Sequence, residues 1–225
     1  MIILNHVWKT HLSRGVRKCV ARDLCFRFPT GQAMALLGRN GAGKSSLLQL
    51  ISGISRPDHG RVQRRGSVSW PVGFQGSFHP DLTGLENARF VARVYGVDTD
   101  EMTRFVADFT NLGAHFHLPV RSYSSGMRAR LGFAISMAVP FDTYLIDEVT
   151  SVGDAAFRRK SEAILHDRLE RASAIVVSHS TELLARLCTS GAVLEDGRLF
   201  YYARVARAIE HHDHLMHGQL PPWMR

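Results

Sequence analysis

The chain of 225 residues has only three cysteines and no long hydrophobic run. The cysteines, Cys19, Cys25 and Cys188, are odd in number and lack the paired spacing of a zinc site, so we expect free thiols in a reducing compartment. The longest apolar stretch, residues 131–139, is well short of the roughly 18 residues that a membrane-crossing helix needs. The first residues lack a basic segment followed by an apolar core, so we expect no signal peptide. These absences argue against a disulfide-bonded secreted domain and against a membrane-spanning protein.

Lysine is scarce too, because 24 of the 28 cationic residues are arginine and four are lysine. Against 20 acidic residues the net charge is 28 − 20 = +8, which could attract nucleic acid, anionic lipid or an acidic partner. The arginines are spread along the chain, and their densest cluster is Arg61, Arg64 and Arg65. This spread favours a general arginine bias over a dedicated nucleic-acid surface. The 45% apolar fraction and the lack of repeats indicate an ordinary globular protein.

Short apolar runs alternate with helical patterns along the chain. The runs at residues 33–37, 143–146 and 174–177 are typical of buried parallel strands. A turn at Asp196-Gly197 predicts a hairpin between the apolar segments on either side of it. The sequence therefore predicts an α/β fold with a mainly parallel central sheet, and we expect the first strands and this hairpin to add an antiparallel subdomain.

Helix signals lie between these strands. A helix is expected at residues 44–51, ending at Gly53, and another at residues 124–139, stopped by a proline. Thr83 and Glu86 have the spacing of a capping box, which predicts the start of a third helix.

Residues Gly38–Ser45 match the pattern G-x-x-x-x-G-K-[ST] at every fixed position, between the expected strand and helix. The glycines let backbone N–H groups point at a phosphate, and the helix adds its positive end. Lys44 can reach the β- and γ-phosphates, and the Ser45 hydroxyl can bind Mg²⁺. The candidate nucleotide-binding residues here are Gly38, Arg39, Asn40, Gly41, Ala42, Gly43, Lys44, Ser45 and Ser46.

A pair of acids follows the expected strand at residues 143–146, about 100 residues after the glycine-rich loop. At the end of a strand beside that loop, Asp147 can hold Mg²⁺ directly or through water. Glu148 can polarise the attacking water as a general base. The two acids and the loop predict a nucleoside triphosphatase site, and they leave kinase, GTPase, ATPase and motor open.

The segment Tyr123–Met127, about 20 residues before Asp147, resembles the signature turn of the ATP-binding cassette (ABC) family. Ser124, Ser125 and Gly126 lie at an expected helix start, which makes a second anion-binding end. In the family this end closes on the γ-phosphate held by the other protomer. The resemblance covers nearly the whole chain. It implies a P-loop core with an antiparallel β subdomain and a helical signature subdomain at about 78–138, within a nucleotide-binding domain of residues 1–210, followed by a short tail at 211–225.

Four more positions resemble family elements. Gln75 matches the glutamine that senses Mg²⁺ and γ-phosphate, and Asp154 matches the acid that crosses the dimer interface. His179 matches the switch histidine that hydrogen-bonds the γ-phosphate. The family's adenine-stacking aromatic has no direct counterpart, and His11 is the best match, with Trp8 nearby. The resemblance thus implies Glu148, His179 and Gln75 as catalytic residues and Ser45, Gln75 and Asp147 as Mg²⁺ ligands.

Within the family, Trp70–Gly73 and the Ser-Ser-Gly-Met form of the signature resemble the ATPase subunits of capsular polysaccharide exporters. His79–Gly84 resembles the related O-antigen and teichoic-acid exporters, which are the alternative. The resemblance implies a homodimer with ATP and Mg²⁺ as cofactors, at the cytoplasmic face of the inner membrane. Its partners would be a separate membrane permease and a polysaccharide export and biosynthesis complex. A groove formed by about residues 75–95 would receive a cytoplasmic helix of the permease. No nucleic acid is expected.

Three other functions fit less well. A mechanical cassette ATPase on ribosomes or DNA would use the +8 charge, but its second cassette or long arm does not fit 225 residues. An importer ATPase is disfavoured by Trp70-Pro71, and a non-catalytic module by the complete set of site residues.

The histidine-rich segment 210–217 is typical of a solvated end rather than a metal site.

Overall fold

The computed structural model describes residues 1–13, 16–72, 78–147 and 154–218. They divide into two compact units, the first from the described parts of 1–71, 141–148 and 169–225, the second from those of 72–140 and 149–168. The elements, in chain order, are β1 (Ile2–Ser13), β2 (Val16–Arg27), β3 (Ala33–Leu37), α1 (Lys44–Ser52), β4 (His59–Arg64), β5 (Val68–Val72), α2 (Gly84–Tyr95), α3 (Thr99–Thr110), the 3₁₀ helices η2 (Gly113–His117) and η3 (Val120–Ser122), α4 (Ser125–Ala138), β6 (Thr143–Asp147), α5 (Ala155–Arg171), β7 (Ser173–Val177), α6 (Thr181–Leu187), β8 (Ser190–Glu195), β9 (Arg198–Tyr202) and α7 (Val205–Met216).

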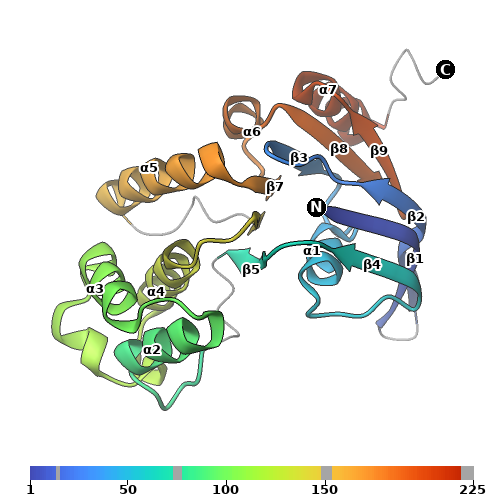
Figure 1. Ribbon diagram of the computed structural model, residues 1–225. Coiled ribbons are helices and arrows are strands. Elements are labelled where there is room, and N and C mark those ends of the chain that lie inside the picture. The colour runs from blue at the N-terminus through green and yellow to red at the C-terminus, as the bar shows by residue number, and fades with distance from the viewer. Residues whose placement is uncertain (14–15, 73–77, 148–153, 219–225) are drawn as a thin grey trace. The chain divides into compact units, whose positions relative to one another are not determined.

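A six-stranded sheet forms the centre of the first unit, in the order β5-β6-β7-β3-β8-β9. Strand β3 pairs in parallel with β7 and β8, and β6 pairs in parallel with β7. Strands β3 and β7 are buried at every residue, as expected for strands covered on both faces. The expected α/β fold with a mainly parallel central sheet is confirmed (Figure 1).

A second, antiparallel sheet has the order β2-β1-β4. The expectation that the C-terminal hairpin belongs to this subdomain is wrong. Leu36 of β3 pairs with Ala192 of β8, and β9 then adds to β8 antiparallel, so the hairpin forms the edge of the central sheet. The run of small and β-branched residues in β8 lets it bury between β3 and β9.

Helix α1 packs into one hydrophobic cluster with residues from both sheets of the first unit. Ser45 in the first turn of α1 is exposed, whereas the apolar residues that follow are buried. These buried residues are Leu47, Leu48, Leu50 and Ile51. Burying each of these side chains stabilises the fold by about 1.5–3 kcal/mol. This core fixes the start of α1 next to the end of β3, where the glycine-rich loop lies.

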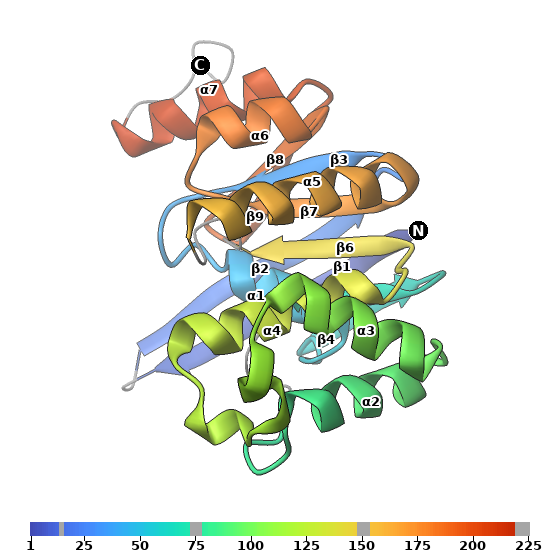
Figure 2. The same ribbon diagram turned by 90° about the vertical axis from the view of Figure 1, so that its left-hand side faces the viewer.

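The second unit is built on the helices α2, α3 and α4, which lie side by side in Figure 2. The capping box at the start of α2 is confirmed, because the Thr83 hydroxyl accepts from the Glu86 N–H and the Glu86 carboxylate accepts from the Thr83 N–H. Phe109 of α3 stacks on Phe133 of α4 with ring centres 5.6 Å apart. The expected boundaries of the helical subdomain and of the 1–210 domain stay predictions.

Helix α7 continues past residue 210 and packs against β8. His211, expected at a solvated end, is only 1% exposed, because its ring packs between Phe200 and Tyr202 of β9. Among the residues that the structure describes, no helix is both long and apolar enough to cross a membrane.

Candidate active site

The glycine-rich loop leaves the buried strand β3 and turns directly into α1. Gly43 at the start of α1 has φ 109°, and a Cβ atom there would lie 2.7 Å from the Cβ of Val20. Only glycine fits this left-handed position against β2. The Ala42 N–H donates to the Arg39 carbonyl at 3.0 Å, which closes the curl of the loop. The backbone therefore adopts a tight turn of the kind that binds phosphate.

Lys44 folds its side chain over this loop. Its Nζ donates to the carbonyls of Gly38, at 2.7 Å, and Arg39, at 3.3 Å. Gly43, the residue before α1, has no side chain that could cap the helix, and the first turn carries no acid. The cation and the helix end thus present positive charge on one side of the loop, which fits a triphosphate.

Asp147 and His179 follow neighbouring strands of the central sheet. Asp147 is the last residue of β6 and pairs with Val177, the last residue of β7, two positions before His179. Strand β7 lies between β6 and β3, and β3 leads to Gly38. Because parallel strands end at the same edge, the loop, Asp147 and His179 lie at one edge of the sheet. Hydroxyl and carboxylate oxygens, as in Ser45 and Asp147, are donors that Mg²⁺ prefers.

His11 reaches α1 from strand β1. Its Nε2 lies 3.0 Å from the Ser46 hydroxyl oxygen, which places the ring beside the glycine-rich loop. Trp8 does not share this place, because it lines a separate hollow together with Thr10 and Leu12. The structure thus brings His11, but not Trp8, to the candidate nucleotide site.

Lys18 is a cation near the loop that the motifs do not reveal. It pairs with His11 across the β1–β2 ladder, and its Nζ lies 3.2 Å from the point where a Cβ of Gly41 would be. Only the strand pairing, which no short motif encodes, brings this residue to the loop.

Helix α7 also approaches the site. The pKa of His212 is lowered chiefly by burial, and the Lys44 cation lowers it further, although the Asp213 carboxylate opposes the shift. The Nδ1 atom of His212 is buried and has no hydrogen-bond partner among the described residues. The histidine-rich segment therefore lies beside the loop.

The signature turn lies in the second unit and is organised by its own side chains. Ser124 is the N-cap of α4, and its hydroxyl accepts from the Met127 N–H at 3.2 Å. Ser124 and Gly126 line a hollow that Asp154 also borders. The start of α4 faces this hollow, as an anion-binding end requires.

Asp154 makes its contacts within the chain. It accepts from the Phe157 N–H at 2.8 Å and from Arg130 at 2.9 Å. The hydrogen bond from the Phe157 N–H and then the Arg130 guanidinium hold the pKa of the Asp154 carboxyl below its usual range. The carboxylate is thus charged and sits beside the signature turn. Gln75, Glu148 and residues 151–153 lie outside the described residues.

Comparisons with known proteins place this chain in a family. Residues 21–151 match the family model described as ABC transporter. The chain is 43% identical to the capsule polysaccharide export ATP-binding protein CtrD of Neisseria meningitidis, over 96% of this chain and 100% of that protein. It is 43% identical to the polysialic acid transport ATP-binding protein KpsT of Escherichia coli, over 93% of this chain and 95% of that protein. It is 37% identical to an O-antigen export system ATP-binding protein, RfbB, of Klebsiella pneumoniae, over 88% and 82%.

Solved structures with the same fold are ATP-binding cassettes. A dimeric cassette in a post-hydrolysis state, bound to ADP and Pi, matches with a TM-score of 0.74 over 88% of this chain and 96% of that chain, at 22% identity. The ATP-binding subunit of an ABC transporter matches with a TM-score of 0.71 over 88% of each chain, at 20% identity. At such identities the likeness concerns the fold alone.

Proposed function

The chain belongs to the ABC transporter family, and we propose that it is the ATP-hydrolysing subunit of an exporter of capsular polysaccharide. The observation that supports the ATPase activity is that the glycine-rich loop (residues 38–45, from here on the P-loop), Asp147 and His179 lie at one edge of the parallel sheet. The choice of glycan rests on relatives named for capsule and polysialic acid export, which the chain matches over nearly its whole length. Export of O-antigen is the second candidate, on the 37% identity to RfbB.

The P-loop side of the site binds the nucleotide. Backbone N–H groups of residues 38–46 and the start of α1 hold the phosphates, and Lys44 exchanges its loop carbonyls for phosphate oxygens. Lys18 adds a second positive charge. His11 contacts the base, with its ring oriented by Ser46.

Hydrolysis uses groups at the carboxyl edge of the sheet. Ser45, Asp147 and Gln75 would hold Mg²⁺, which would supply positive charge to the phosphate oxygens. Glu148 accepts the proton of the attacking water as general base. His179 donates a hydrogen bond to the γ-phosphate and stabilises the charge that develops there.

The signature turn completes the site from a second copy of the chain. Ser124, Ser125 and Gly126 offer a hydroxyl and helix N–H groups to the γ-phosphate bound by the partner's P-loop. Asp154 crosses the interface between the two chains. Two ATP molecules are thereby enclosed in a homodimer.

A separate permease carries the glycan, and α2 supplies part of the surface that it contacts. Phe90 and Val94 lie one turn apart on α2, and each is 59% exposed. Such an apolar strip on a helix is typical of a protein contact. The chain is thus a peripheral subunit at the cytoplasmic face of the inner membrane, within a polysaccharide export and biosynthesis complex.

The ATPase assignment is tested by Glu148→Gln. This variant keeps ATP binding and forms a dimer with ATP, but its turnover falls by at least about a hundredfold because the general base is lost. Glu101→Gln, on the surface of α3, is the matched control and turns over normally. Normal hydrolysis by Glu148→Gln overturns the assignment.

The export assignment is tested in encapsulated cells that lack the gene. Wild-type protein restores surface polysaccharide, whereas with Glu148→Gln the polysaccharide accumulates inside the cell. Surface O-antigen that depends on the protein, with capsule unaffected, would favour the second candidate instead.

A further inference from the structure

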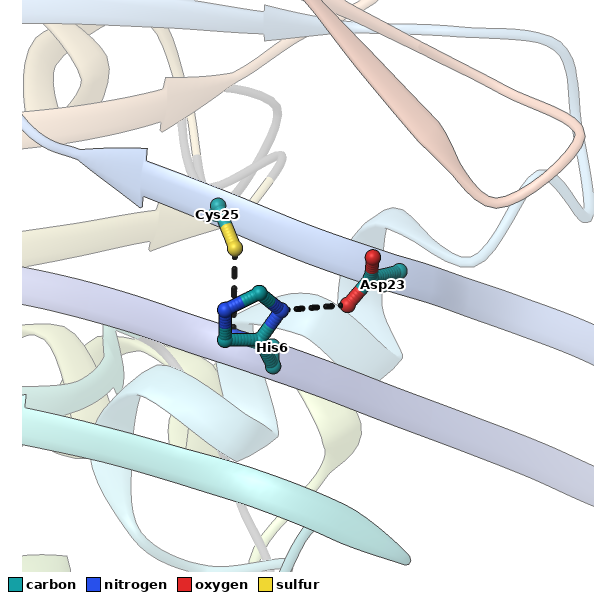
Figure 3. Close-up of side chains that lie close together, drawn as sticks. All are labelled: His6, Asp23 and Cys25. Carbon is teal, nitrogen blue, oxygen red and sulfur yellow. Dashed lines mark hydrogen bonds and ion pairs between the residues drawn. The ribbon is translucent and has the colours of Figure 1, made fainter.

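An imidazole, a carboxylate and a thiol meet on the strand pair β1–β2, away from the P-loop (Figure 3). They belong to His6, Asp23 and Cys25, and one ligand atom from each lies within 4.8 Å of the other two. His6 Nδ1 is 2.8 Å from Asp23 Oδ1, and the backbone N–H of His6 donates to Cys25 Sγ at 3.3 Å. All three residues are exposed, so an ion from solvent can reach them.

Two facing bulges bring these side chains together. Leu4 pairs with Phe26 and Val7 with Leu24, so β1 has one extra residue in the interval that contains His6. In the next interval, up to the pair of Lys9 with Ala21, β2 has the extra residue. Bulges redirect side chains and often lie at functional sites.

Both bulges hold a side chain in an unusual backbone conformation. His6 has φ 50° and Asp23 has φ 52°, in the left-handed region that few residues other than glycine adopt. Gly60 of β4 has φ 77°, and a Cβ atom there would collide with the backbone carbonyls of Asn5 and His6. A glycine in the third strand thus makes room for the bulge, which shows that the surrounding sheet is adapted to it.

The three donors match one class of metal. Zinc is bound by imidazole nitrogen, thiolate sulfur and carboxylate oxygen at about 2.0–2.3 Å, in a tetrahedral arrangement. Neighbouring ligand atoms of such a tetrahedron are about 3.3–3.8 Å apart. When the ends of the exposed side chains move by about 1 Å, the longer separations, up to 4.8 Å, shorten to this range, and the 2.8 Å between His6 Nδ1 and Asp23 Oδ1 widens to it. Mg²⁺ prefers oxygen ligands, so it does not compete here.

We propose that His6, Asp23 and Cys25 bind one zinc ion, with water at the fourth position. The ion joins β1 to β2 at the bulges, in addition to the ladder. The sequence conceals the site, because its ligands come from two strands and lack the spacing of a zinc motif.

Cobalt(II) is the probe for this site, because a thiolate ligand gives bound cobalt a near-ultraviolet charge-transfer band. The metal-free, reduced full chain is titrated with Co²⁺, and we expect the band to saturate at one metal per chain and to disappear when zinc is added. Histidines of α7 that bind cobalt cannot produce this band. A wild-type chain without the band overturns the proposal.

Variants locate the ligands. Cys25→Ser loses the band. His6→Ala and Asp23→Ala weaken cobalt binding by at least about tenfold, because loss of a residue that only supports a metal ligand already costs about that much affinity. Cys19→Ser is the matched control on the same strand and keeps the full band. An equal band in Cys25→Ser, or unchanged affinity in both other variants, contradicts the proposal.

Zinc protection against alkylation gives a second readout. Zinc slows the alkylation of Cys25 in the wild-type chain but not in His6→Ala, and it leaves Cys19 unaffected in both. Unprotected Cys25 in the wild-type chain speaks against the site. These readouts need no ATP hydrolysis, so they are independent of the proposed transport function.

Discussion

Two helix starts, those of α1 in the first unit and α4 in the second, carry the phosphate-binding features that we propose for this molecule. Before α1 stands Gly43, which has no side chain to cap the helix. Before α4 stands Ser124, whose hydroxyl already accepts from the Met127 N–H. No side chain caps the N–H groups of the first end, whereas at the second end the Ser124 oxygen accepts from the Met127 N–H and its own O–H remains to donate to a phosphate.

The cations near the two ends differ in the same way. Near α1, Lys44 donates to carbonyls of the loop that would bind the phosphate, and Lys18 lies beside Gly41. Near α4, Arg130 is paired with Asp154 at 2.9 Å. We infer that the α1 end binds ATP in a single chain and that the α4 end acts only when a second chain presents it.

Removing Lys44 gives the largest expected effect. Lys44→Ala loses the cation that neutralises the β- and γ-phosphates, so we expect hydrolysis to fall by at least about a hundredfold and ATP binding to weaken strongly. Steady-state hydrolysis and titration with a fluorescent ATP analogue measure both. Lys160→Ala, in the second unit, keeps both activities; equal losses in the two variants contradict the assignment of the phosphate site.

Changing Ser124 separates binding from turnover. Ser124→Ala removes a donor for the partner's γ-phosphate, so we expect hydrolysis to fall about ten- to hundredfold while ATP binding by the single chain stays unchanged. Loss of the cap also lowers stability by about 1 kcal/mol, which a melting curve measures. Ser122→Ala, two residues earlier, keeps full hydrolysis. Weaker ATP binding by the isolated Ser124→Ala chain would erase the difference between the two ends.

Lys18 has a smaller effect than Lys44, because it is exposed and screened by solvent. Lys18→Ala weakens ATP binding about three- to tenfold, which corresponds to about 1 kcal/mol. Arg17→Ala is the matched control, since Arg17 lines the separate hollow with Trp8. Equal affinity of Lys18→Ala and wild type would remove Lys18 from the site.

Acid pH should lower the free energy of unfolding of the first unit, because His211 is buried in the folded chain. Burial lowers the pKa of this histidine, although the nearby Glu195 carboxylate opposes the shift. The unfolded chain therefore binds its proton first, and the free energy of unfolding falls as the pH drops from about 6.5 through the lowered pKa. In His211→Gln this loss between pH 7.5 and pH 5 is smaller than in the wild-type chain. Denaturant unfolding at both pH values measures it; an identical loss in both proteins contradicts the role of His211.

Local patterns predicted those parts of the molecule that depend on neighbouring residues. The P-loop lies between β3 and α1 as expected, and Thr83 and Glu86 form their capping box. These features need only a few adjacent residues, because glycine conformation and capping geometry are set locally.

Features that depend on pairing of distant strands were missed. The sequence predicts the hairpin β8–β9 in the antiparallel subdomain, because turn chemistry shows that a hairpin forms but not which strand it joins. Lys18 reaches Gly41, and His6 reaches Asp23, only through the register of β1 and β2. The position of the histidine cluster near the terminus predicts that His211 is in solvent, yet β9 covers it.

Complementation between two damaged chains tests the central claim most directly. Lys44→Ala and Ser124→Ala chains, each also carrying Glu148→Gln to prevent hydrolysis, are tagged differently and mixed with ATP. In the mixed dimer one site keeps an intact P-loop and an intact signature turn, so we predict ATP-dependent association in the mixture, measured by sedimentation, that exceeds association in either variant alone. Association that is no stronger in the mixture than in the separate variants would contradict a site shared between two chains.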